Sequence, residues 1–235
     1  MNDLDARDIV SPTLYSGHDE RVWFGGGKFH RLAGFTRHFH SAPRDRYRQV
    51  NFLTGAAMMM RLGRWRELGG FREPLFLYWE DTDLCIRASR TGSRLFVVRD
   101  ARVWHRTGGS SRRGEIEGKS RVWYYFLARN RLVVCAPYAL RSPMFFVTGL
   151  SASLGLAFKA LREPNDRFAK LAWLIRGSWD GLRAQNDAQL RTLTDWRAAQ
   201  LGLEHQTRAS SSDMPHHSAS SVVRHAFLAD RVVSE

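Results

Sequence analysis

One segment constrains this chain more than any other: an apolar run that is followed at once by three carboxylates. Residues 71–79 are rich in large apolar side chains, and Glu80, Asp81 and Asp83 come directly after Trp79. Water is scarce beside such a run, so a carboxylate there is desolvated and its pKa rises. A carboxylate with a raised pKa is suited to general-base catalysis. The segment is therefore a candidate active site.

The same carboxylates would also suit the start of a helix. Acidic residues stabilise a first helical turn because they face the positive end of the helix dipole. Asp81 could be the N-cap of such a helix, and Asp83 and Arg87 have the spacing of a local ion pair. The pattern alone leaves capping and catalysis open. The two roles are compatible, because a capped helix end is also a rigid platform.

The pattern along the chain predicts a mixed α/β region that is followed by helices. Gly69-Gly70 and Gly92 each follow a short periodic segment and predict the end of a helix. Gly25-Gly26-Gly27 indicates a tight turn, a close approach to a ligand or a flexible loop. Residues 50–60 have the length of a strand and a turn, and we expect a central strand that ends at Gly55. Strands are also expected at 95–98 and 102–104, and helices at 64–68, 79–90 and 115–136.

Two later segments carry strong helical signals. Residues 142–158 contain no charged side chain, but they are short for a membrane span, which needs about 20 apolar residues. A buried core helix or a helix in the membrane interface fits this segment better. Residues 165–183 are amphipathic and basic, which suits either an anionic bilayer surface or packing on the domain. Beyond about residue 200 the sequence lacks periodicity, so disorder is expected.

The net charge is +13, and arginine carries most of it. Such a balance favours anionic partners: nucleic acid, diphosphates or an anionic membrane surface. However, the arginines are scattered over every segment, and no helix-turn-helix, zinc or aromatic RNA-binding signature is found. We therefore expect a membrane surface and sugar-nucleotide phosphates rather than nucleic acid. An arginine-rich nucleic-acid binder is the rival hypothesis.

Several motifs in a fixed order resemble family 2 glycosyltransferases, and most of all the rhamnosyltransferase-like branch that builds bacterial surface polysaccharides. The likeness covers roughly residues 50–136. The motifs are Asn51-Phe-Leu-Thr-Gly-Ala-Ala-Met, Leu68-Gly-Gly-Phe-Arg-Glu, Phe76-Leu-Tyr-Trp-Glu-Asp-Thr-Asp-Leu-Cys-Ile-Arg and Val97-Val-Arg-Asp-Ala-Arg-Val-Trp-His, with weaker likeness at 11–15, 23–27 and 124–131.

The resemblance implies an α/β fold, namely an incomplete GT-A-like (nucleotide-diphospho-sugar transferase) fold with C-terminal helices. Residues 1–140 would be the C-terminal part of the GT-A-like domain. Residues 141–190 would be a helical segment that could associate with a membrane, and 191–235 would be a disordered tail.

Members of this family begin with a parallel α/β half that binds the nucleotide and ends in a metal-binding Asp-x-Asp motif. Asp3-Leu4-Asp5 has this spacing, but no buried strand precedes it, so we interpret it as a coincidence. We expect the chain to be the acceptor-side portion of such an enzyme. It would then need a missing N-terminal half or a partner subunit.

The implied reaction is an inverting sugar transfer from a nucleotide-sugar donor to a cell-surface polysaccharide or lipid-linked glycan acceptor. Asp81 would be the general base, and Glu80 would orient Asp81 or bind the acceptor. His105 would complete the coordination of a divalent metal, Mn²⁺ or Mg²⁺, on the diphosphate; a neutral imidazole suits Mn²⁺ better. The substrate-binding residues would be Gly55, Ala56, Trp79, Asp83 and Arg106.

Such an enzyme would be cytoplasmic and peripheral at the inner face of the plasma membrane. The alternative is a catalytically inactive remnant or an accessory subunit that binds a membrane or a partner protein.

Overall fold

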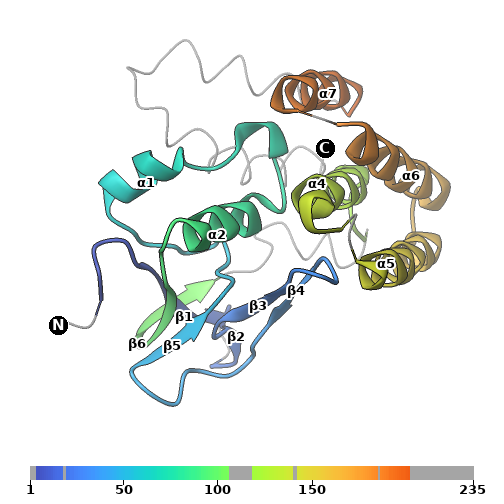
Figure 1. The fold of residues 1–235 in the computed structure, drawn as a ribbon. Helices are drawn as coiled ribbons and strands as arrows, with labels where there is room; N and C mark the ends of the chain where they lie inside the picture. Colours follow the sequence, from blue (N-terminus) through green and yellow to red (C-terminus); the bar gives the residue numbers. More distant parts are fainter. Residues whose placement is uncertain (1–3, 18–19, 106–117, 140–141, 185, 202–235) are drawn as a thin grey trace, which may run out of the picture. The chain divides into compact units, whose positions relative to one another are not determined.

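The computed structural model describes residues 4–17, 20–105, 118–139, 142–184 and 186–201, and these divide into two compact units. The first unit contains the described residues up to Arg72 together with those from Glu80 to His105. The second contains Glu73–Trp79 and the described residues from Gly118 onward. Figure 1 shows the strands of the first unit and the helices α4 to α7 of the second.

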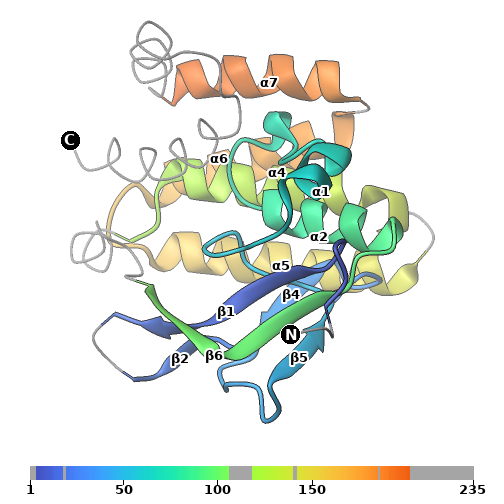
Figure 2. The same ribbon diagram turned by 90° about the vertical axis from the view of Figure 1, so that its left-hand side faces the viewer.

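The first unit is built on a mixed four-stranded sheet with the strand order β2-β1-β6-β5, and a separate hairpin joins β3 to β4. β1 is parallel to β6, whereas β2 and β5 pair in the antiparallel direction with β1 and β6 (Figure 2). The strands are β1 (Ile9–Ser16), β2 (Val22–Phe24), β3 (Gly27–His30), β4 (Phe35–His38), β5 (Tyr47–Val50) and β6 (Leu95–His105). The expected mixed α/β character is confirmed.

β6 is one long strand where the sequence predicts two short ones. Its pairing with β1 shifts in register, since Pro12 pairs with Val98 and Thr13 pairs with Arg102. The three residues between Val98 and Arg102 therefore form a bulge, and it lies where Asp100 separates the two predicted strands. Thr13 Oγ1 donates a hydrogen bond to the Val98 carbonyl (3.0 Å) and so stabilises this irregular point.

The strand predicted over 50–60 is wrong. β5 ends at Val50, and the following segment makes only isolated bridges, from Phe52 to Gly27 and from Met59 to Val10. The side chain of Asn51 provides a physical reason, because it accepts a hydrogen bond from the Phe29 N–H (2.7 Å) and donates one to the Phe29 carbonyl (3.1 Å). An amide side chain thus takes the place of a backbone strand partner.

The two predicted helices of this unit are confirmed as α1 (Leu62–Leu68) and α2 (Glu80–Arg90). α1 ends at Gly69, which is left-handed with φ 71° and donates its N–H to the Arg66 carbonyl. The buried Arg64 of α1 links this helix to the end of α2, because its Nε donates to Ser93 Oγ at 2.9 Å.

Gly25 and Gly27 have no room for a side chain. A Cβ at Gly25 would lie 1.9 Å from the Ser41 carbonyl oxygen, and one at Gly27 would lie 2.4 Å from Cδ1 of Phe52. Gly26, between them, has φ 115°, a conformation that favours glycine. The glycines therefore permit a turn that packs tightly against the chain itself.

The second unit is helical. It contains the 3-10 turn η1 (Glu73–Leu75) and the helices α4 (Arg121–Ala139), α5 (Pro143–Arg162), α6 (Arg167–Arg183) and α7 (Asp187–Gln200). Helices expected over 115–136, 142–158 and 165–183 are confirmed within the described residues. α7 was not expected: the tail predicted from residue 191 begins inside this helix, and its part beyond residue 201 lies outside the described residues.

α4 and α6 approach each other very closely at two glycines of α6. A Cβ at Gly177 would lie 2.3 Å from the Tyr125 carbonyl oxygen, and one at Gly181 would lie 2.6 Å from the Arg129 carbonyl oxygen. Small residues spaced by four positions let two helix backbones meet in this way. Beside them, Asp180 accepts a hydrogen bond from the Tyr125 hydroxyl at 2.9 Å. The contact between α4 and α6 therefore organises this unit.

The close approach predicts opposite effects for two Gly→Ala changes. Gly177→Ala should destabilise the protein by about 1–3 kcal/mol, because the new methyl group would force the helices apart. Gly155→Ala, on α5, is the matched control. A Cβ there meets nothing within 4 Å, so the better helix propensity of alanine should stabilise by up to about 1 kcal/mol. Urea unfolding of both variants tests this, and equal effects would contradict the packing.

Candidate active site

The candidate carboxylates open helix α2. The helix begins at Glu80, so Glu80, Asp81 and Asp83 all lie in its first turn. Asp81 therefore lies inside the helix, and the interpretation of Asp81 as the N-cap is wrong. The favourable position near the positive end of the helix dipole remains.

Asp81 is held in place by three hydrogen bonds. Its Oδ2 accepts from the backbone N–H of Gly55 at 3.0 Å, and its Oδ1 accepts from the N–H (2.6 Å) and hydroxyl (3.2 Å) of Thr82. A Cβ at Gly55 would lie 3.4 Å from the Asp81 Cβ, so a small residue suits this contact. The structure thus brings together Gly55 and Asp81, two of the residues that the sequence singles out, and Ala56 follows directly in the chain.

Glu80 lies next to Asp81 in an unfavourable electrostatic environment. Its Oε2 atom is buried and has no hydrogen-bond partner among the described residues. Burial raises the pKa of Glu80 to about 8, and the neighbouring negative charge of Asp81 contributes to this shift. Burial also raises the pKa of Asp81, although its hydrogen bonds to Gly55 and Thr82 oppose the rise. The two carboxyls titrate as a pair, and this pair holds a proton near neutral pH.

Asp83 has a local partner. Its Oδ2 accepts a hydrogen bond from Nε of Arg87 at 2.7 Å, four positions further along α2. Arg87 also donates to the carbonyls of Leu68 and Gly70, at the end of α1. The ion pair expected from the spacing is confirmed, and it links the two helices. A role of Asp83 in substrate binding stays a prediction.

The backbone immediately before Glu80 is unusual. Phe76, Tyr78 and Trp79 have positive φ values of 63°, 64° and 70°. Residues other than glycine rarely adopt this conformation. Each instance costs about 1–3 kcal/mol and persists only where the surrounding structure imposes it. Trp79 is also buried. This burial gives it a packing role, and its contact with a sugar stays a prediction.

Two fully buried side chains of α4 hold this backbone in place. Nη2 of Arg129 donates to the carbonyls of Pro74 (2.9 Å) and Leu75 (3.0 Å). Nδ2 of Asn130 lies 2.7, 2.8 and 2.9 Å from the carbonyl oxygens of Leu75, Leu77 and Tyr78, which share its two hydrogens. We call these two residues the Arg-Asn clamp.

The Arg-Asn clamp is internally connected and has further support. Nε of Arg129 donates to Oδ1 of Asn130 at 2.8 Å, and Nη1 donates to Oγ1 of Thr194 on α7, also at 2.8 Å. The sequence pattern did not predict the clamp. The available signal was an Arg-Asn pair inside an otherwise apolar helix, because such polar groups are buried only when they are hydrogen-bonded.

His105 lies at the end of β6 and is half-buried. Its ring centroid lies 4.6 Å from that of Trp23, and burial lowers the pKa of the imidazole, so the ring is neutral at pH 7. Within the described ranges, no group of three or more His, Cys, Asp or Glu side chains could hold a metal ion. The described residues therefore do not form a complete metal site, and ligation by His105 stays a prediction. Arg106 lies outside the described residues.

The stretch of chain that contains the candidate carboxylates matches a known protein family. Residues 28–125 match the model of a family described as "Glycosyltransferase like family 2". This stretch contains Gly55, Glu80, Asp81 and His105. The match covers less than half of the chain, so it shows that this stretch is similar to the family. The expected resemblance is thereby confirmed for this part of the chain.

The chain is also similar to a named enzyme, N-acetylglucosaminyl-diphospho-decaprenol L-rhamnosyltransferase of Mycobacterium tuberculosis, in strains CDC 1551 / Oshkosh and ATCC 25618 / H37Rv. The identity is 32% over 84 residues, which cover 34% of this chain and 27% of the relative. The match thus spans little more than a quarter of the relative's length.

The Arg-Asn clamp predicts a large loss of stability on truncation. Asn130→Ala would leave buried carbonyls of the 73–79 segment without a donor, so we expect a loss of about 2–4 kcal/mol. Ser151→Ala, which removes one exposed hydrogen bond on α5, is the control and should change stability by less than about 0.5 kcal/mol. Chemical unfolding measures both. A stable Asn130→Ala variant would show that the clamp does not hold the segment.

The raised pKa of Glu80 predicts how stability depends on pH. Its pKa rises from 4.5 in the unfolded chain to about 8 in the folded one, so its stabilising contribution is complete below pH 4.5 and is lost as the pH rises through 8. Glu80→Gln mimics the protonated form. It should match the wild type near pH 4.5 and be more stable by over about 1 kcal/mol at pH 8 to 9.

Thermal melts across this pH range provide the test. Ser151→Ala supplies the control, since it removes one exposed hydrogen bond and no titratable group and should leave the pH profile unchanged. Parallel profiles for the wild type and Glu80→Gln would refute the raised pKa.

Proposed function

We propose that this protein takes part in an inverting sugar transfer from a nucleotide-sugar donor to a glycan or lipid-linked acceptor. The observation that carries this proposal is the Asp81 carboxylate, which is anchored on the Gly55 N–H beside a protonatable Glu80. Both carboxylates belong to the segment that matches the glycosyltransferase family. A carboxyl pair that can hold a proton thus lies in the stretch that matches a family of sugar-transferring enzymes.

Asp81 is the general base in this mechanism. Its carboxylate takes the proton from an acceptor hydroxyl while the hydroxyl oxygen forms a bond to the anomeric carbon of the donor. The bond between that carbon and the diphosphate oxygen breaks, and the diphosphate leaves with the electron pair. Because attack comes from the face opposite to the leaving group, the anomeric configuration inverts.

In this mechanism Glu80 keeps the total negative charge of the Glu80–Asp81 pair low. Near neutral pH it holds the proton of the pair, so Asp81 can carry the negative charge that a base needs without repulsion from a second carboxylate. Burial raises the pKa of Asp81, which strengthens it as a base. Glu80 thus acts through Asp81, which is the positioning role expected from the resemblance.

The name of the mycobacterial relative supports the proposed acceptor and donor classes. The mycobacterial relative is named for a decaprenol-linked sugar acceptor and for rhamnosyl transfer. We extend to this chain only the broader class, a cell-surface or lipid-linked glycan. GT-A enzymes commonly use Mn²⁺ or Mg²⁺ on the donor diphosphate, and His105 would be one ligand.

Donor binding tests this proposal. The full chain is titrated calorimetrically with UDP-, dTDP- and GDP-sugars, each with Mn²⁺ or Mg²⁺, and then assayed for transfer to a lipid-diphosphate sugar acceptor. We expect one donor class to bind in a metal-dependent way, and His105→Ala to lose that binding. If no donor binds and no transfer occurs, the accessory-subunit alternative replaces the enzyme.

The two carboxylates should respond differently to amide substitution. Asp81→Asn removes the base and should lower kcat by about 10²–10⁴-fold, with little change in donor affinity. Glu80→Gln preserves the neutral form of Glu80 and should keep kcat within about tenfold at pH 7. Steady-state transfer rates of the two variants distinguish the roles. Full activity in Asp81→Asn would rule out Asp81 as the base.

A further inference from the structure

Helix α5 exposes most of its apolar surface. It is a 20-residue helix that is long and apolar enough to cross a membrane, yet only 11% of its most apolar stretch is buried. The expectation that this segment could be a buried core helix is therefore wrong. A soluble protein rarely leaves such an extended apolar surface without an interaction partner.

The exposed side chains form one continuous stripe along α5. Val147, Leu150, Leu154 and Phe158 are 69%, 63%, 61% and 55% exposed, and Leu161 extends the series. Their spacing of three or four positions places them on one side of the helix. Phe145 and Ala160 are buried instead, so α5 has a packed side and an open apolar side. We call the open side the α5 stripe.

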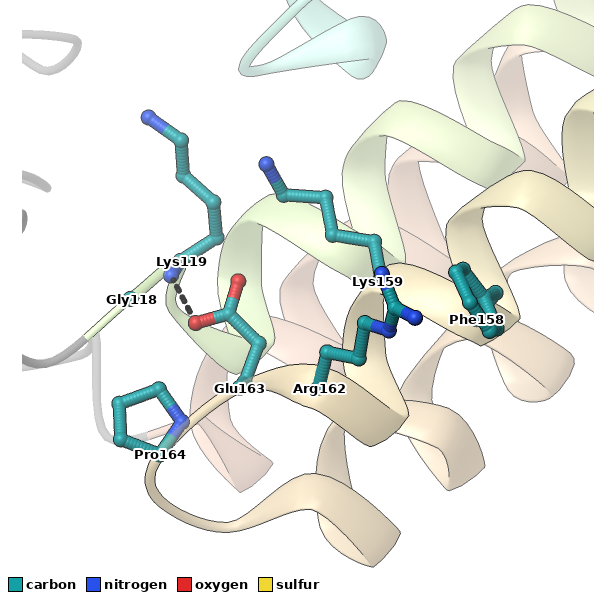
Figure 3. Close-up of a pocket in the computed structure, with 7 residues that line it drawn as sticks. All are labelled: Gly118, Lys119, Phe158, Lys159, Arg162, Glu163 and Pro164. Atoms are coloured by element: carbon teal, nitrogen blue, oxygen red, sulfur yellow. Dashed lines mark hydrogen bonds between the residues drawn. The ribbon is translucent and has the colours of Figure 1, made fainter.

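A basic hollow lies at the C-terminal end of the α5 stripe. It has a volume of about 460 Å³, and its lining includes Phe158 of the stripe together with Lys119, Lys159, Arg162 and Glu163. Figure 3 shows the side chains of Lys119 and Lys159 extending in the same direction from this hollow. The apolar stripe and the cationic groups are therefore neighbours on one surface.

The cations of the hollow are available to a ligand. Its one carboxylate, Glu163, accepts hydrogen bonds from the Lys119 N–H (3.0 Å) and the Tyr124 hydroxyl (3.1 Å), and it pairs with the buried Lys170 (3.5 Å). Within the described part of the chain, Lys119, Lys159 and Arg162 form no ion pair with a carboxylate. Their side chains instead lie near aromatic rings, as Arg162 does over Phe158 at 3.9 Å.

We propose that α5 lies in the surface of an anionic phospholipid bilayer. The α5 stripe would enter the boundary between headgroups and acyl chains, and Lys119, Lys159 and Arg162 would bind headgroup phosphates. Charge complementarity selects this occupant, because the chain carries a net charge of +13 and the inner leaflet is negatively charged.

The neighbours of α5 favour a position along the membrane over one that spans it. α5 packs on α6 (Figure 1), and α6 bears the exposed cations Arg167, Arg176 and Arg183. Charged side chains in the hydrocarbon core are costly, whereas a helix at the interface keeps its charged neighbours in water. This position would make the protein peripheral at the cytoplasmic face of the plasma membrane, where a lipid-linked acceptor is within reach.

Vesicle binding tests this proposal independently of sugar transfer. The full chain is sedimented with vesicles of phosphatidylcholine, with and without phosphatidylglycerol. Wild-type protein should bind the anionic vesicles. Leu150→Glu/Leu154→Glu should weaken this binding by more than about tenfold, and Lys159→Glu/Arg162→Glu should abolish the preference for phosphatidylglycerol. Leu62→Glu is the control, because Leu62 is exposed (59%) in the first unit, and it should bind as the wild type does.

Three results would overturn the proposal. The first is wild-type affinity in the α5 stripe variant with its circular dichroism unchanged, and the second is an equal loss in the Leu62→Glu control. The third is a wild-type protein that ignores vesicles but forms oligomers that Leu150→Glu/Leu154→Glu dissociates. In that case the α5 stripe binds a second copy of the chain.

Discussion

Hydrogen bonds from Arg129 and Asn130 to the backbone of residues 74–78 fix the segment that directly precedes the candidate carboxylates. Phe76 and Tyr78 of this segment, and Trp79 directly after it, have left-handed backbone conformations. The carbonyls of Pro74, Leu75 and Leu77 accept buried hydrogen bonds. Without charged and amide donors, these carbonyls would lose their hydrogen bonds, and the segment would relax. Glu80, the first residue of α2, follows Trp79 directly in the chain. A buried polar pair on α4 therefore stabilises a strained segment that leads into the carboxylates.

The pKa values at the site follow from the position of Glu80 and Asp81 at the start of α2. A carboxylate pair at a helix start is favoured by the helix dipole, yet burial and mutual repulsion raise the pKa values of both members. Asp81 is stabilised by the Gly55 and Thr82 hydrogen bonds, whereas Oε2 of Glu80 has no partner among the described residues. The asymmetry assigns the proton to Glu80 and the charge to Asp81. This division is what a base and its neighbour require.

Local signals in the sequence predict part of this arrangement. Gly69 and Gly92 mark the ends of α1 and α2, and spacing alone predicts the Asp83–Arg87 pair. The contact between Gly55 and Asp81 joins residues 26 positions apart, so only the family resemblance could suggest it. The prediction of a strand within 50–60 was wrong, because apolar composition does not reveal that the Asn51 side chain takes the place of a strand partner. The exposure of α5 could not be predicted from the sequence either, since a core helix and an interfacial helix have similar compositions.

A direct carboxyl titration tests the central claim most sharply. Carbon-13 NMR of glutamate side chains across pH 4 to 10 would be recorded for the wild type, Glu80→Gln and Asp81→Asn. The account predicts one signal, missing in Glu80→Gln, that titrates near pH 8 and shifts to lower pH in Asp81→Asn, where the neighbouring charge is gone. If the Glu80 signal titrates near the ordinary glutamate value of about 4.3 and ignores Asp81→Asn, the carboxylate pair is not the tuned base that the mechanism requires.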